Sequence, residues 1–299
     1  MHSFMTGTAL HYLGDQTSAR QHFDSIVNQN FTPERHALFA HRTAASAKLS
    51  IILWAQGFPD QAARRAQSAI DDARSLGNAL LLCNILAHAT CPLALYVGDL
   101  ATAERWVAML LDRSSKHALT ARNAQGRCLQ GMLLLAQGDI AGVELLRTAL
   151  DWLRQARFGL GHTISLGALA QGLAAAGQMA EAHIAIDEAL ERSDRNEERW
   201  CMPELLRIKG ELVLSDGPAA AAETAESFFL QALDWARRQV ALSWELRTAT
   251  SLAKLWHQDG KTSEANDLLS AVYQRFDEGF DTSDLMAARA LMDEFCRTS

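Results

Sequence analysis

Four segments of this chain place a glycine next to an aspartate between two apolar runs, and a turn of this type is able to bind a phosphate. They are HYLGDQTSARQHF (11–23), LYVGDLATAERWV (95–107), LLLAQGDIAGVELL (133–146) and LWHQDGKTSEANDLL (255–269). In a phosphate-binding loop, glycines let backbone N–H groups approach the phosphate, and a lysine follows in the pattern GxxxxGK[ST]. That pattern does not occur in the sequence. Because one arrangement appears four times, we expect a structural role for it and no bound cofactor.

Other residues with catalytic or metal-binding chemistry are isolated. Gly159 and Gly161 begin a GxG pattern that lacks its third glycine and follows a helical run, which favours a turn between helices over a nucleotide loop. His88 and Cys91 lie one helical turn apart, but no second ligand pair accompanies them at zinc spacing. Neither HExxH nor GxSxG occurs. The sequence therefore predicts a protein that is not an enzyme and holds no metal.

Composition excludes further classes of protein. The 299 residues carry a net charge of −7, whereas a nucleic-acid-binding surface is normally basic. The five cysteines form no CxxC and lie mostly in apolar helical runs, as reduced thiols of a cytosolic protein do. The first residues lack the charged and apolar regions of a signal peptide. We expect a cytoplasmic protein that does not bind nucleic acid directly.

The apolar segment 79–97 is long enough to cross a bilayer. Its residues, ALLLCNILAHATCPLALYV, include no acid, Lys or Arg, and about 20 apolar residues suffice for a membrane span. Asn84, His88 and Pro92 interrupt it, and Gly98-Asp99 ends it as in the other copies of the motif. These features favour a buried helix of a soluble array.

The glycines of these turns belong to a repeat that extends along the whole chain. The spacing is 39 to 43 residues for Gly14, Gly57, Gly98, Gly138, Gly177, Gly217 and Gly260. Apolar residues on both sides of each glycine follow the period of an α-helix, so each unit is interpreted as helix, tight turn and helix. Glycine supplies the left-handed backbone that ends the first helix, and Asp or a hydroxyl residue caps the second. The predicted units are 1–32, 33–77, 78–116, 117–157, 158–198, 199–240 and 241–280, followed by a capping helix in 281–299.

A small residue follows most of these glycines by five positions and should lie where the two helices of a unit touch. The residues are Ala19, Ala62, Ala103, Ala182 and Ala265, with Val143 in the fourth unit and Ala225 after a longer loop in the sixth. We expect Ala182 and Ala265 not to tolerate a larger side chain. Ala219 and Ala220, in the long loop, should tolerate one.

The repeat resembles the tetratricopeptide repeat. The resemblance rests on a small residue followed four positions later by a large one (Ala19 and Phe23, Ala225 and Phe229, Ala265 and Leu269), and on Leu-Ala-x2-Trp at 252–256. It implies an all-α, right-handed superhelical solenoid of about seven units, although these units are near 40 residues and the tetratricopeptide repeat has 34.

Three segments of the last third are similar to one group of C-terminal repeat regions. These are 199–214, 225–256 and 278–295, and the group belongs to bacterial signalling ATPases, adenylate-cyclase-like proteins and winged-helix transcriptional regulators. None of the upstream parts of such proteins is present, so no ATPase residue is assigned. The chain begins almost within a helix, as a severed array or a short relative would.

First helices of such an array line its concave surface, where solenoids bind partners. Projecting the repeat onto those helices predicts a partner-binding groove that includes Trp54, His88, Gln125, Gln171, Arg207, Glu211, Arg247, Lys254 and His257. Two alternatives stay open. Arg207 and Arg247 would instead pair with Glu204 or Glu245 on neighbouring turns, and core packing explains the tryptophans more simply than ligand stacking.

The resulting functional hypothesis is a non-catalytic protein–protein interaction scaffold, the regulatory or partner-sensing region of a bacterial signalling or transcription-regulatory protein. The partner would be a protein or peptide, including an ATPase, cyclase or DNA-binding domain upstream or in trans. The alternative is a sensor that binds a small molecule or peptide inside the superhelix, and a closed superhelix with pockets would favour it. Phe4, Leu10 and Leu13 also predict an apolar N-terminal end that docks a second copy of the chain or another domain.

Overall fold

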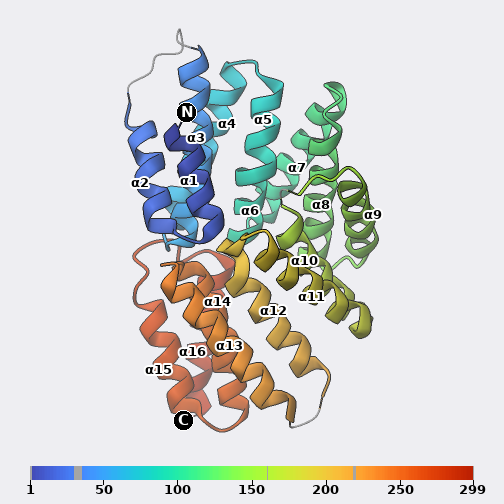
Figure 1. The fold of residues 1–299 in the computed structure, drawn as a ribbon. Coiled ribbons are helices and arrows are strands. Elements are labelled where there is room, and N and C mark those ends of the chain that lie inside the picture. The colour runs from blue at the N-terminus through green and yellow to red at the C-terminus, as the bar shows by residue number, and fades with distance from the viewer. Residues whose placement is uncertain (1, 30–35, 160, 218–219, 299) are drawn as a thin grey trace.

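The computed structural model describes residues 2–29, 36–159, 161–217 and 220–298, and no strand occurs in these ranges. The first half contains α1 (His2–Leu13), α2 (Gln16–Val27), α3 (His36–Ala55), α4 (Pro59–Ser75), α5 (Ala79–Ile85), the π-helical turn η1 (Leu86–Thr90), α6 (Cys91–Val97), α7 (Leu100–Lys116), α8 (Thr120–Ala136) and α9 (Ala141–Gln155). The second half contains α10 (His162–Ala175), α11 (Met179–Arg195), the 3-10 turn η2 (Arg199–Cys201), α12 (Met202–Ser215), α13 (Ala220–Arg238), α14 (Leu242–Gln258), α15 (Thr262–Tyr273) and α16 (Ser283–Thr298). Successive helices pack as antiparallel pairs in an all-α repeat solenoid (Figure 1).

The glycine turns end the first helix of each pair as predicted. All seven glycines of the repeat have positive φ, from +75° at Gly177 to +100° at Gly217. Two of the four aspartates are N-caps: Asp15 Oδ1 accepts a hydrogen bond from the Ser18 N–H at 2.9 Å, and Asp99 Oδ1 accepts one from the Thr102 N–H at 3.0 Å. The Gly-Asp motif is therefore a hinge between two helices.

Small residues lie at the contact between paired helices, with one change from the predicted frame. Ala19, Ala62, Ala103, Ala182, Ala225 and Ala265 are all 0% exposed. In the fourth unit the close approach occurs one position before Val143, because a Cβ on Gly142 would lie 2.4 Å from the carbonyl oxygen of Gly131. Ala219 lies outside the described residues, and so does the side chain of Ala220.

The apolar segment 79–97 forms one helical stretch, α5–η1–α6, as the first helix of its unit. Its 19 residues have a mean hydropathy of 1.8 over an 18-residue window, and 61% of that window is buried inside the protein. Pro92 lacks an N–H, so it cannot complete the α-helical hydrogen bond to the residue four positions earlier. The chain accommodates it with the π-helical turn at Leu86–Thr90, in which the N–H of Cys91 bonds to the carbonyl of Leu86. His88 is part of this turn.

The solenoid curls far enough for its first units to rest on its last ones. A Cβ on Gly14 would lie 2.7 Å from Nε2 of Gln239, and one on Gly57 would lie 2.6 Å from Cδ2 of Leu242. The third glycine turn, at Gly98, meets Ser283 in the same way. Figure 1 shows the blue helices α1–α4 stacked on the orange-to-red helices α13–α16. This contact between distant units closes the superhelix.

Polar contacts and aromatic rings hold the closure. The Ser243 hydroxyl donates a hydrogen bond to the carbonyl oxygen of Trp54, 189 residues away. The rings of Trp54 and Trp244 pack edge to face at 4.6 Å between centroids. Farther along, the Glu278 carboxylate accepts hydrogen bonds from the backbone and side chain of Gln61, at 3.0 and 3.2 Å.

Candidate functional site

Three adjoining cavities lie on the concave side of the closed superhelix, and nearly all of their lining residues belong to first helices of the pairs. All three cavities are partly open, and their volumes include space that is open to solvent. The N-terminal cavity, between α1, α3, α5, η1 and α8, has a volume of about 680 Å³. The central cavity, between α1, α3, η1, α6, α8 and α10, contains about 670 Å³. The C-terminal cavity, between α6, α8, α10, α12 and α14, contains about 1030 Å³.

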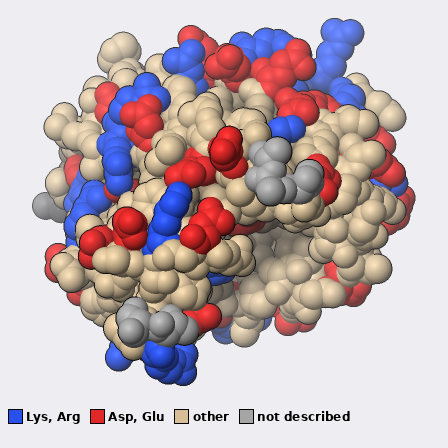
Figure 2. All heavy atoms as spheres, turned by 90° about the horizontal axis from the view of Figure 1, so that it is seen from below, with Lys and Arg blue, Asp and Glu red and all other residues tan. Residues whose placement is uncertain are grey.

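Neighbouring cavities share walls. Tyr12, Lys48 and His88 line both the N-terminal and the central cavity. Tyr96, Met132 and Ile164 line both the central and the C-terminal cavity. Figure 2, seen from below, shows a hollow walled mostly by uncharged residues, with charged side chains around it. The concave surface is thus a row of mainly apolar cavities with few polar groups, which is the usual composition of a ligand-binding site.

The central cavity contains an unsatisfied polar atom. Imidazole Nε2 of His88 is buried and has no hydrogen-bond partner within the described ranges. Buried donors normally have a partner, and leaving one unpaired costs about 1–3 kcal/mol. The Trp200 indole faces the Glu198 carboxylate and counters the rise in its pKa that burial causes. On the same wall, the Glu198 carboxylate is 7% exposed and accepts a hydrogen bond from the Thr163 hydroxyl. Burial raises the pKa of Glu198, against the opposing effect of that hydrogen bond.

Buried histidines line the central cavity in their neutral form. Burial, together with the charge of Lys48, lowers the pKa of His11 to about 4, although a hydrogen bond with Gln16 opposes the shift. Burial, Lys48 and Arg122 lower the pKa of His88 well below its ordinary value. These side chains are therefore hydrogen-bonding groups and carry no charge at neutral pH.

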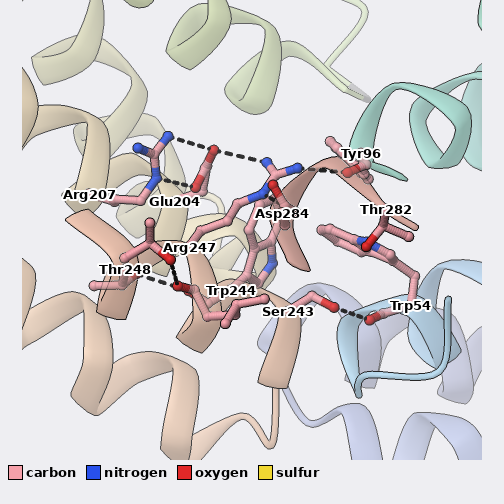
Figure 3. Close-up of polar contacts among 12 residues, drawn as sticks. Trp54, Tyr96, Glu204, Arg207, Ser243, Trp244, Arg247, Thr248, Thr282 and Asp284 are labelled. Carbon is pink, nitrogen blue, oxygen red and sulfur yellow. Dashed lines mark hydrogen bonds and ion pairs between the residues drawn. The ribbon is translucent and has the colours of Figure 1, made fainter. Parts of the chain in front are cut away.

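An ion cluster borders the C-terminal cavity, and two of its members, Glu204 and Arg247, line that cavity (Figure 3). Arg207 donates to both carboxylate oxygens of Glu204, at 2.7 and 2.9 Å. Arg247 donates to Glu204 at 3.2 Å, to Asp284 at 2.7 Å and to the carbonyl oxygen of Tyr96 at 2.8 Å. Burial raises the pKa of Glu204, but the two arginines outweigh it and hold that pKa below its ordinary value. Each arginine of this cluster faces at least one carboxylate, and the hydrogen bond to Tyr96 connects α14 to α6, 151 residues away.

The residues predicted for the groove divide between the cavities and other environments. His88, Gln125, Gln171 and Arg247 line the cavities. Trp54 does not; it is 2% exposed and stacks on Tyr96 at 4.4 Å.

The remaining four predicted residues lie away from the cavity walls. Arg207 and Glu211 bond to each other in the ion cluster. Lys254 is exposed on α14. The His257 ring hydrogen-bonds to Thr262 and packs against Phe295.

The alternative pairing of the arginines is half correct. Arg207 pairs with Glu204 one turn away, as that alternative held. Arg247 pairs with Glu204 and with Asp284 on α16, whereas Glu245 pairs with Arg237 and Arg275. Packing of α14 against the neighbouring α12 and α16 selects the partners of Arg247.

Lys48, Arg122 and Glu198 are cavity residues that sequence reasoning did not select. One signal was available for Lys48. It is the only lysine in the otherwise apolar run AASAKLSIILWA (44–55), three positions before the groove-facing residue Ile51. A charged residue on the buried face of a helix requires a partner or a function.

No three His, Cys, Asp or Glu side chains cluster as metal ligands within the described ranges. Leu160 of the GxG segment lies outside those ranges, and Gly161, with φ +75°, precedes α10. Gly159 and Gly161 lie between α9 and α10 and belong to no helix.

Together, the paired helices, glycine hinges and concave cavities define a tetratricopeptide-like helical-repeat protein. The solved structures with similar folds include three Rap proteins. The apo form of RapI matches 98% of this chain over 98% of its own length, at 13% identity and a TM-score of 0.58. A Rap protein complexed with Competence and Sporulation Factor matches 98% of this chain over 75% of its own, at 13% identity and a TM-score of 0.64.

The Rap conjugation gene regulator of plasmid pLS20, in complex with the Phr* peptide, matches 99% of this chain over 74% of its own, at 13% identity and a TM-score of 0.63. Identity of this level shows a shared fold. No protein-family profile matches the chain, and no curated protein sequence matches it.

Proposed function

We propose that this chain is a non-catalytic regulatory repeat protein that binds a short peptide inside its superhelix. The observation that carries the proposal is the row of adjoining cavities inside the closed solenoid, with the unpaired Nε2 of His88 on the wall that two of them share. A peptide backbone supplies both N–H and carbonyl groups that would pair with this ring nitrogen, and apolar walls accommodate its side chains. Two solved structures of similar fold contain a bound factor or peptide, which supports the same class of ligand.

The closed superhelix favours a sensor over an open scaffold. A folded partner needs a continuous exposed surface of roughly 800 Å², whereas these cavities are partly open recesses, each lined by several helices. The output of such a sensor would pass to a protein partner, such as an ATPase, cyclase or DNA-binding domain upstream or in trans. The similarity of segments 199–214, 225–256 and 278–295 to repeats of bacterial signalling proteins supports that part of the proposal.

Affinity selection tests the peptide-binding function. A synthetic pool of random hexapeptides with free termini is equilibrated with the immobilised full chain, and retained peptides are identified by tandem mass spectrometry. Met132→Trp fills the wall shared by the central and C-terminal cavities, so it should abolish retention. Met286→Trp makes the same change at a residue of α16 that is 53% exposed, and should leave retention unchanged. Equal retention by these two variants would refute binding in the cavities.

Self-association through the N-terminal end is a second proposal, supported by exposed apolar side chains on α1. Met5 is 66% exposed and Leu13 is 42% exposed, whereas Phe4 turns inward and lines the N-terminal cavity. Light scattering at micromolar concentration should detect a dimer that Leu10→Glu with Leu13→Glu disrupts. A monomeric unmutated chain would exclude this interface between copies and leave docking of another domain.

A further inference from the structure

The N-terminal cavity contains two basic side chains and no acidic one among the residues that line it. Nζ of Lys48, on α3, lies 5.3 Å from the centre of the Tyr12 ring. The guanidinium of Arg122, on α8, donates to the side-chain oxygens of Asn84 and Gln125. In the part of the chain that the structure describes, neither Lys48 nor Arg122 belongs to an ion pair. The fold therefore positions two cations with neutral partners.

The other buried arginines of the concave surface are treated differently. Arg207 and Arg247 face the carboxylates of Glu204, Glu211 and Asp284, so their charges are neutralised within the fold. Removing a charge from water without an opposite charge is unfavourable. Lys48 and Arg122 are thus an exception, because neither forms an ion pair within the described residues and the only carboxylate that attracts Lys48 electrostatically, Glu198, lines the neighbouring central cavity.

The neighbouring imidazole responds to this excess of positive charge. Burial, then Lys48 and Arg122, hold the pKa of His88 well below its ordinary value. Its Nε2 is buried without a hydrogen-bond partner in the described ranges. The π-helical turn that Pro92 imposes sets the position of this ring between the N-terminal and central cavities. An anionic group would compensate both cations and accept a hydrogen bond from the ring.

We propose that the N-terminal cavity is a carboxylate subsite, in which Lys48 and Arg122 bind a carboxylate of the peptide and Nε2 of His88 donates a further hydrogen bond. This inference rests on the proposed peptide-binding function. The hydrogen bonds that the Arg122 guanidinium donates to Asn84 and Gln125 fix its plane, which suits a planar, two-oxygen acceptor. The carboxylate is either the C-terminus of the peptide or an Asp or Glu side chain. The Glu198 carboxylate attracts Lys48 from the central cavity, which Lys48 also lines, but it forms no ion pair with Lys48 and does not line the N-terminal cavity.

Three hexapeptide pools distinguish these sources. The first has free C-terminal carboxylates and no Asp or Glu, the second has C-terminal amides and includes Asp and Glu, and the third has C-terminal amides without Asp or Glu. Retained peptides are resynthesised, and their Kd values are measured by calorimetry on the full chain. We expect peptides of the first or second pool to bind about tenfold to hundredfold more tightly than peptides of the third, as one charge-assisted interaction provides.

Paired variants assign the preference to the cavity. Lys48→Met with Arg122→Gln should weaken binding of carboxylate peptides about tenfold to hundredfold and leave uncharged amides unaffected. The control variant Lys254→Met with Arg127→Gln removes one lysine and one arginine charge at exposed positions, and Arg127 lies on the same helix as Arg122. It should change neither the affinity for carboxylate peptides nor the affinity for uncharged amides. Lys48 is only partly buried, so Lys48→Met alone should fold even if the first double variant does not. This single variant must still reduce the preference for carboxylate peptides.

The outcomes separate the two proposals. If the unmutated chain binds the uncharged amides as tightly as the carboxylate peptides, the carboxylate subsite is refuted while peptide binding stands. If both double variants lose affinity equally, long-range charge explains the preference and the subsite is again refuted. If no pool is retained, or Met132→Trp retains peptides normally, the proposed function fails and the subsite fails with it.

Discussion

Single alanines decide how closely two helices of a pair approach. Ala265 is 0% exposed at the contact between α14 and α15, and Leu269 beside it is equally buried. A leucine at position 265 has no space, so Ala265→Leu should lower the free energy of unfolding by about 1–3 kcal/mol. Ala271 lies on the exposed face of the same helix, where the same change should cost less than about 0.5 kcal/mol. Urea denaturation of the two variants measures the difference, and equal midpoints would contradict the assigned contact.

Buried histidines make stability depend on pH at the residue scale. Burial, with the charges of Arg192 and Arg154, lowers the pKa of His162 to about 4, and neither ring nitrogen has a hydrogen-bond partner within the described ranges. A depressed folded-state pKa means that the unfolded chain binds the proton first as pH falls. The contribution of neutral His162 to the free energy of unfolding is therefore complete above pH 6.5 and is lost progressively as the pH falls toward 4.

His162→Leu removes this titration and the two unpaired ring nitrogens. We expect the variant to be at least as stable as the unmutated chain at pH 7. Between pH 7 and pH 5 the free energy of unfolding of the variant should fall by about 2 kcal/mol less than that of the unmutated chain, as follows from the shift of one histidine pKa to about 4. Urea titrations at the two pH values test this. Parallel losses in both proteins would show that His162 titrates normally.

At the scale of the element, two glycines let α8 and α9 cross at backbone contact. A Cβ on Gly142 would lie 2.4 Å from the Gly131 carbonyl oxygen and 2.8 Å from Cγ of Leu135. Helix propensity alone predicts that Gly→Ala stabilises a helix by about 1 kcal/mol. At position 142 the added Cβ would clash with the backbone of α8, so the change in stability is in the opposite direction. Gly142→Ala should destabilise the protein by about 1–3 kcal/mol.

A control variant on the same helix separates the effect of packing from the effect of helix propensity. Thr148 is exposed on α9, so Thr148→Ala should leave stability unchanged or raise it slightly through helix propensity. Thermal unfolding followed by circular dichroism compares the two variants. A Gly142→Ala variant that melts above the unmutated chain would disprove the close crossing.

At the scale of the whole molecule, the first three glycine hinges carry a second constraint that the later ones lack. Gly57 has φ +92°, and a Cβ there would meet Leu242 at 2.6 Å, across the closure. Gly177 has φ +75°, with nothing within 4 Å of such a Cβ. Alanine at either position suffers the unfavourable left-handed backbone, costing about 1–2 kcal/mol. Only Gly57→Ala should also separate the two ends of the solenoid.

Small-angle X-ray scattering measures this separation. We expect a larger radius of gyration for Gly57→Ala and an unchanged one for Gly177→Ala, with a greater loss of thermal stability in the first. Identical radii for both variants and the unmutated chain would show that the closure does not depend on this contact.

The sequence by itself determined the repeat, because period, hinge glycines and small contact residues depend on neighbours within one helix pair. Those local rules gave the helical class and placed His88, Gln125 and Gln171 on the first helices. The sequence did not reveal that Gly57 meets Leu242, that Arg247 pairs with Asp284, or that Lys48 and Arg122 share a cavity without a carboxylate. Only the tertiary structure decided these points, because small rotations between successive pairs accumulate along the solenoid until distant units touch.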